Sequence, residues 1–236
     1  MTMKGTGAAS LREIDSFDGG DSAAADANLR GVGWLAYPDE LMQRASHAFA
    51  RDGEVWVVDP VDAQGVDDLL ADLGDVAGVL VLLDRHTRDA AAIADRHDVA
   101  VHIPGWMTGV ANELDGPVER LDPGATVAGF QVHEVVDTLL WQEAALHRPS
   151  DGALYVPEAL GTVDYFTAGD DRLGVHPMLR FTPPRSLRGL EVERLFVGHG
   201  AGITDGAGKT VASAIDRARR DAPRAWYEAL RDVITR

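Results

Sequence analysis

Apolar and polar residues alternate in blocks along the chain, and the clearest block lies between residues 79 and 103. An unbroken apolar run at 79–83 precedes a cluster of polar residues at 84–89. A run this short, and rich in branched side chains, is typical of a strand buried on both faces. A helix-like segment around Ile93 and a second apolar run at 99–101 complete a strand–helix–strand unit. Such units place reactive groups at strand ends, so we predict a site centred on 84–89.

The front of the chain has the pattern of an antiparallel meander. Apolar segments at 32–37, 45–50 and 54–58 predict three strands, and Arg51-Asp52-Gly53 has the composition of a hairpin turn. Residues 63–73 carry apolar side chains at helical spacing, which predicts a helix that ends at Gly74.

The rest of the chain repeats the combination of strands and helices. Residues 104–124 are interrupted by Pro and Gly and predict a loop; strands are expected at 126–132, 138–146, 153–156 and 195–197. Helices are expected at 204–219 and 223–235. The order predicts an α/β fold with two mixed sheets between helices. We expect a loose N-terminal segment at 1–28, apart from apolar Leu11, Ile14 and Phe17, and one domain at 29–236.

Composition narrows the range of functions. The chain has a net charge of −16, and its only lysines are Lys4 and Lys209, a pattern found in proteins of salt-loving cells. This acidity disfavours nucleic acid and anionic membranes as partners, so we expect a small-molecule ligand or substrate. Without cysteine, any metal needs histidine and carboxylate ligands. The N-terminus lacks a signal-peptide pattern, and we expect a cytoplasmic protein. The oligomeric state stays open.

Four segments in order resemble the metallo-β-lactamase superfamily of four-layer αββα hydrolases, over residues 34–218. Residues 46–60 are similar to the opening hairpin with its Asp, and 81–89 to the signature strand and turn. Residues 153–159 are similar to the strand before a metal-bridging Asp, and 195–200, LFVGHG, to the strand before the last metal-binding His. The resemblance implies one or two zinc ions that activate water for attack on an ester or amide.

The signature of active members, H-x-H-x-D-H, is altered in this chain. Asp84 stands at the first His, His86 matches the second, Arg88 replaces the Asp, and Asp89 replaces the last His. The resemblance therefore makes Asp84, Arg88 and Asp89 candidate catalytic residues and His86 a candidate ligand.

The other motifs supply further candidates by the same resemblance. Glu158 replaces the bridging Asp, and His199 matches the terminal His. His133 lies near the position of the third-motif His, in an uncertain register, and is the weakest candidate ligand. Asp59 follows a strand and is expected to orient a ligand.

Arg88 reverses the charge where the second metal would sit. A guanidinium can occupy a cation site, and we expect it to pair with Asp84, Asp89 or Glu158. Three hypotheses remain open. In the first, one zinc or iron ion is held by His86, His199 and a carboxylate in a hydrolase acting on an ester or thioester. In the second, Arg88 replaces the metal in a non-catalytic binding or scaffold protein. In the third, a small-molecule binder or hydrolase uses Arg88 to hold an anionic substrate without metal.

Overall fold

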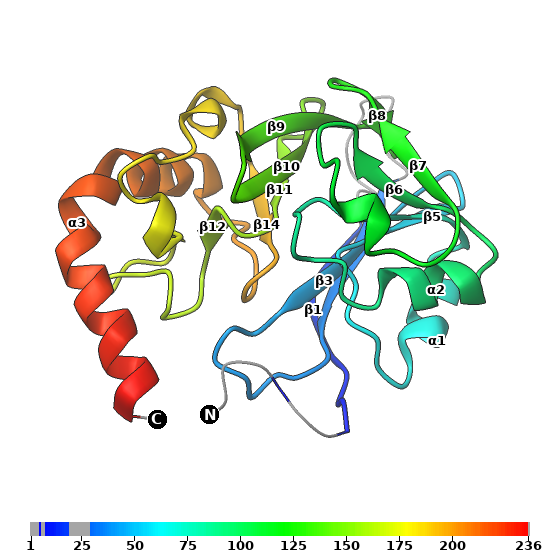
Figure 1. Cartoon of the computed structure of the whole chain (residues 1–236), viewed down its shortest axis with the longest axis horizontal. Coiled ribbons are helices and arrows are strands. Elements are labelled where there is room, and N and C mark those ends of the chain that lie inside the picture. Colours follow the sequence, from blue (N-terminus) through cyan, green and yellow to red (C-terminus); the bar gives the residue numbers. More distant parts are fainter. Residues whose placement is uncertain (1–4, 6–7, 19–28, 236) are drawn as a thin grey trace.

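Two β-sheets pack against each other, with helices on the two outer faces (Figure 1). The structure is a computed structural model that describes residues 5, 8–18 and 29–235. Helices α1 (Val66–Ala71) and α2 (Ala90–Arg96) pack on one sheet, and α3 (Ala207–Thr235) packs against the other side of the molecule. The predicted α/β fold with two mixed sheets in a four-layer αββα arrangement is confirmed.

The first sheet contains seven strands in sequence order. They are β1 (Arg12–Asp18), β2 (Arg30–Leu35), β3 (Ala45–Arg51), β4 (Glu54–Val58), β5 (Asp75–Leu80), β6 (Val101–Pro104) and β7 (Val118–Leu121). β1 to β4 are antiparallel, as the predicted meander requires, and β4 to β7 are parallel. The β3–β4 hairpin turns at Asp52 and Gly53, which both have positive φ, at 54° and 88°. This is the backbone shape of the tightest hairpins.

The second sheet has the order β14-β11-β10-β9-β8. Its strands are β8 (Thr126–Val127), β9 (Phe130–Thr138), β10 (Trp141–Arg148), β11 (Ala153–Val156) and β14 (Arg194–Val197). β11 and β14 are parallel, so the chain leaves both at the same edge. A separate pair, β12 (Leu160–Gly161) and β13 (Gly174–Val175), follows β11. Three short 3-10 turns complete the fold: η1 (Val110–Asn112), η2 (Pro177–Leu179) and η3 (Arg185–Gly189).

Four local predictions need correction. The predicted strand 126–132 is two strands, because Ala128 and Gly129 form a tight turn with φ of 51° and 83°. The predicted loop 104–124 contains β7, whose half-exposed edge position allows charged residues that hide its pattern. The two predicted final helices form one, α3, with Pro223 inside. A proline inside a helix removes one backbone hydrogen bond, and for this reason the sequence predicted a break at Pro223.

The fourth correction concerns the N-terminal segment. Residues 12–18 form edge strand β1, and their polar sequence reflects that exposed position. Phe17 from this strand packs on Phe49, as expected of its apolar character, whereas residues 19–28 lie outside the described part of the chain. In that described part, no helix combines the length and apolar character needed to cross a membrane.

Aromatic rings fill the space between the two sheets. Phe49 of β3 lies 4.8 Å from Phe130 and 5.5 Å from Phe196, measured between ring centroids, and both partners come from the second sheet. Phe49 is 1% exposed. This contact fixes how the strand ends of one sheet meet those of the other.

We therefore expect Phe49→Ala to lower the free energy of unfolding by about 3–5 kcal/mol, through lost burial and the cavity left between the sheets. Leu139→Ala, at a fully exposed position, is the control and should change it by less than about 0.5 kcal/mol. Denaturant unfolding followed by circular dichroism measures both. Equal effects of the two substitutions would mean that the sheets do not depend on this contact.

Candidate metal centre

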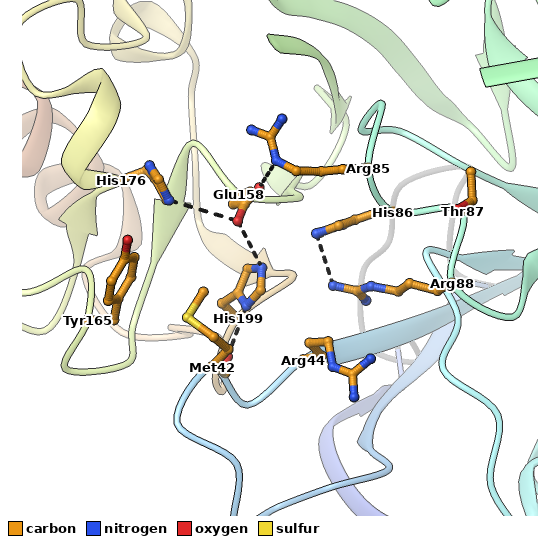
Figure 2. A pocket seen from close by; sticks show the side chains of 10 residues that line it. All are labelled: Met42, Arg44, Arg85, His86, Thr87, Arg88, Glu158, Tyr165, His176 and His199. Carbon is orange, nitrogen blue, oxygen red and sulfur yellow. Dashed lines mark hydrogen bonds and ion pairs between the residues drawn. The ribbon is translucent and has the colours of Figure 1, made fainter. Parts of the chain in front are cut away.

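A cavity of about 480 Å³ opens where strands of both sheets end. Figure 2 shows the side chains that line it. The charged and titratable members come from widely separated parts of the chain and include Arg85, His86, Arg88, Glu158, His176 and His199.

Two parallel strands of the second sheet bring Glu158 and His199 together. Glu158 follows β11 and His199 follows β14, and the last residues of these strands, Val156 and Val197, are paired. Between them Gly198 approaches Pro157 so closely that a Cβ would lie 2.2 Å from the Pro157 carbonyl oxygen. Glycine at this position therefore permits the tight approach that sets Glu158 beside His199.

His86, Glu158 and His199 form a buried group. One possible ligand atom from each lies within 4.8 Å of the others, so the group could hold a metal ion. Glu158 Oε1 lies 3.7 Å from His199 Nε2. Burial raises the pKa of Glu158, while the neighbouring Arg85 opposes that rise. The structure thus brings together three residues that the sequence marked as ligands.

Hydrogen bonds fix the tautomers of both histidines. His199 Nδ1 lies 2.9 Å from the Met42 carbonyl oxygen, which can only accept, so Nδ1 carries the proton. His86 Nε2 lies 3.2 Å from Arg88 Nη2, which can only donate, so the proton of His86 is on Nδ1, facing Asp59 Oδ2 at 3.3 Å. The His86 Nε2 lone pair therefore accepts from Arg88, whereas the His199 Nε2 lone pair has no hydrogen-bond partner in the described residues.

His199 Nε2 has an unsatisfied lone pair. The atom is buried and has no hydrogen-bond partner in the described residues. Burial lowers the pKa of His199 well below its usual range, which keeps the ring neutral. An unpaired acceptor of this kind costs free energy unless something binds to it.

Arg88 ties the strand ends to each other. Its Nη1 donates to the carbonyl oxygens of Ala45 at 2.8 Å and Asp59 at 2.6 Å, and its Nη2 reaches that of Gly198 at 3.4 Å. The expected pairing of Arg88 with Asp84, Asp89 or Glu158 is wrong. Arg88 has φ of +40°, and the turn directs its guanidinium under His86 to the strand-end carbonyls (Figure 2).

Asp59 lies beneath His86, as the sequence predicts for an orienting residue. It is fully buried, and besides His86 its carboxylate accepts from the Leu82 N–H at 2.9 Å and the Tyr155 hydroxyl at 2.8 Å. Desolvation raises its pKa to about 6, against the opposing charge of Arg88.

Asp84 and Asp89 point away from the cavity, although we predicted catalytic roles for them. Asp84 accepts from the Gln142 N–H and pairs with Arg85, each at 2.8 Å. Asp89 accepts from the Asp62 N–H at 2.8 Å, at the start of α2. Neither lines the cavity; their carboxylates bond to groups outside it, whereas the residues between them, 85–88, line it.

His133 also lies elsewhere. Its strand position pairs with Ala145, and its ring meets that of His147 edge-on, with centroids 5.6 Å apart. It is not among the residues that line the cavity. Because β9 begins only after the turn at Ala128 and Gly129, the register assumed from sequence was unreliable here.

Two residues that line the cavity lacked a clear sequence signal. Arg85 donates to Glu158 Oε2 at 2.8 Å and covers the Trp141 ring at 3.8 Å. His176, from the irregular stretch before η2, lies 3.9 Å from Glu158 Oε1, and burial lowers its pKa to about 3. The polar cluster at 84–89 is the sequence feature that could have placed Arg85 at the cavity. Nothing in the local sequence pattern around His176 indicates that it lines the cavity.

Buried Glu143 supports Glu158 from behind. Its Oε1 accepts from the N–H groups of Glu158 and Ala159, both at 2.8 Å, and its Oε2 accepts from Trp141 Nε1 at 2.7 Å. Desolvation raises its pKa to about 7 despite these bonds. Its position at β10, next to an exposed hairpin, gave no hint of this role.

Solved structures share this architecture. A DIM-1 metallo-β-lactamase matches with a TM-score of 0.56 and 12% sequence identity, over 89% of this chain and 100% of that one. A mutant flavo di-iron protein from Thermotoga maritima matches at 0.59 and 12%, over 87% and 62%. The metal-soaked Flv1 flavodiiron core from Synechocystis sp. PCC6803 matches at 0.60 and 10%, over 91% and 62%.

These comparisons establish the class of fold. The chain has the metallo-β-lactamase fold, and identities this low carry no further conclusion about activity. No protein-family model and no curated protein sequence matches the chain. The altered metal-binding signature is therefore inferred from the residues of this chain alone.

The raised pKa of Glu143 predicts how stability depends on pH. The folded state keeps this proton up to about pH 7, whereas the unfolded chain loses it near 4.5. The stabilisation is complete below the unfolded pKa and is lost as the pH rises through the folded pKa. We expect the free energy of unfolding to fall between these pH values, and to fall less steeply in Glu143→Gln. Urea unfolding across this range measures both slopes; identical slopes would contradict the shift.

Proposed function

We propose that this protein is a metallo-β-lactamase-fold hydrolase with a mononuclear metal centre, held by His86, Glu158 and His199, that acts on a small ester or thioester. The observation that carries the proposal is the buried, unpartnered Nε2 of His199, which faces Glu158 Oε1 at 3.7 Å. A zinc or iron ion would satisfy that lone pair.

The tautomers support this assignment. Metal-binding histidines usually donate their other ring N–H to a carbonyl or carboxylate, which fixes the ring and leaves one lone pair for the ion. His199 does this with the Met42 carbonyl and His86 with the Asp59 carboxylate. The donor set therefore fits one divalent ion, provided that His86 Nε2 exchanges its Arg88 contact for the ion.

Arg88 supports one ion rather than two. Its guanidinium lies 3.2 Å from His86 Nε2 and carries a permanent positive charge at the position that the resemblance gives to the second metal. Three strand-end carbonyls hold it there. A second cation beside it would be repelled.

The side chains around the group suggest how a substrate would be handled. A bound divalent ion supplies Lewis-acid chemistry at a substrate carbonyl. Arg88 and Arg85 place positive charge where negative charge develops on the acyl oxygen. Glu158, whose pKa burial raises, would have to lose its proton to hold the ion.

Metal content tests the proposal directly. For protein purified without chelator we expect about one zinc or iron per chain by mass spectrometry, and loss of that metal in His199→Ala. His133→Ala is the matched control, since it removes a histidine outside the cavity, and should retain the metal. Two ions per chain would mean that Arg88 does not exclude the second site; none would refute the metal centre.

A second experiment addresses the competition for His86. Arg88→Met removes the donor at 3.2 Å from His86 Nε2 and a positive charge, so we expect zinc affinity to rise by about tenfold or more. Arg88→Lys keeps the charge and should gain less. A chelator-competition titration on variants shown by circular dichroism to be folded measures this. Unchanged or weaker zinc binding in Arg88→Met would contradict the competition.

The Arg88–His86 hydrogen bond itself favours a second candidate function. With the guanidinium in place of a metal, the cavity would be a binding site for a small anionic molecule in a non-catalytic protein. The metal analysis separates the two candidates, because only the hydrolase requires an ion at His199.

A further inference from the structure

We infer that His176 is a neutral hydrogen-bond donor that binds the acyl oxygen of the substrate and stabilises the negative charge on it when the acyl carbon becomes tetrahedral. This inference rests on the proposed function and adds a catalytic residue to it. His176 lies between β13 and η2 and lines the cavity on the side opposite the turn at 84–89 (Figure 2).

The tautomer of His176 is the opposite of that of the two candidate ligands. Its Nδ1 accepts from the Met178 backbone N–H at 3.2 Å, so this nitrogen has no proton and the ring is neutral. The ring proton is therefore on Nε2, whereas in His86 and His199 the proton is on Nδ1. A protonated Nε2 has no lone pair for a metal ion, so at this atom His176 donates a hydrogen bond instead.

The Nε2–H of His176 has no acceptor within hydrogen-bond distance in the described part of the chain. Glu158 Oε1, which it faces, lies 3.9 Å away, beyond the usual range of about 2.7–3.2 Å. The same oxygen lies 3.7 Å from the unpaired Nε2 of His199. The cavity therefore has an unpaired acceptor and an unpaired donor beside one carboxylate oxygen. A metal ion would satisfy the first, and a substrate oxygen would satisfy the second.

Packing holds this donor in place. The ring of His176 is 6% exposed and lies edge-on to Trp141 and Phe166, with centroid distances of 4.8 and 5.3 Å. The ring of Tyr165 lies 5.6 Å away on the same measure. These contacts and the hydrogen bond at Nδ1 fix the ring before a substrate binds, so the donor needs no rearrangement as charge develops on the oxygen.

The arginines of the cavity use their hydrogens elsewhere. Arg85 donates through Nε to Glu158 and through Nη1 to Asp84, and Nη1 of Arg88 donates to two strand-end carbonyls. Their charge favours an anionic oxygen in the cavity. His176 adds a hydrogen bond of fixed direction, which a charge alone does not provide.

Nitrogen NMR of protein labelled with ¹⁵N-histidine tests the tautomer without any substitution. After treatment with chelator, two-bond ¹H–¹⁵N spectra should show a histidine that is protonated at Nε2 and absent from the spectrum of His176→Phe. A proton on Nδ1 of His176 would overturn the inference, because the Met178 N–H could then not bond to it.

Methylphosphonate, whose charged oxygens surround a tetrahedral centre, tests the binding role by calorimetric titration at saturating zinc. Its affinity should fall about tenfold in His176→Phe, which keeps an aromatic ring and removes the donor. His176→Gln, whose amide N–H lies near the position of Nε2, should retain most of the affinity. His133→Phe is the matched control, because it makes the same change outside the cavity, and should leave the affinity unchanged. Circular dichroism first shows that each variant is folded.

Each outcome decides the inference. Equal affinities of wild-type protein and His176→Phe for methylphosphonate would overturn it, as would no binding by the wild-type protein. Weaker zinc binding in both His176→Phe and His176→Gln, measured by chelator competition, would overturn it by making His176 a metal ligand. Failure of the proposed function is distinguishable: the wild-type protein would bind no metal, while the Nε2 proton and the effect of His176→Phe persisted in a titration without zinc.

Discussion

The site depends on one interaction, the guanidinium of Arg88 bound to the carbonyl oxygens of Ala45, Asp59 and Gly198. Two of these carbonyls belong to strand ends of the first sheet, and the third follows β14 of the second. One rigid cation therefore joins both sheets at the edge where the cavity opens. A planar fork of N–H donors suits several carbonyls at once. The arginine has a structural role at this edge, whatever the cavity binds.

The same arginine sets the electrostatics of the neighbouring residues. Its hydrogen bond to His86 Nε2 places the His86 proton on the Asp59 side, where burial raises the carboxylate pKa to about 6. His199 has no such donor, so its Nε2 stays unpaired in a buried position. The two histidines have the same tautomer for different reasons. One lone pair is occupied by Arg88 and the other is free, which makes His199 the more informative position for metal binding.

The surroundings of the cavity are polar on one side and apolar on the other. Toward the first sheet lie Arg88 and a layer of hydrogen-bonded polar groups; toward the β9–β10 hairpin lie Trp141 and an apolar groove. Arg85 connects the two, because its guanidinium both pairs with Glu158 and covers the indole ring.

The sequence by itself determined the two-sheet α/β fold, the strand ends that carry His86, Glu158 and His199, and the place of Arg88 in the altered signature. Buried strands have an apolar pattern that is legible locally, and the polar residues that follow them mark the site. Only the tertiary structure decided what Arg88 bonds to, that Asp84 and Asp89 point away, and that His176 and Glu143 join Glu158. Those contacts join residues far apart in the chain, and their geometry depends on how the two sheets pack, which no local pattern encodes.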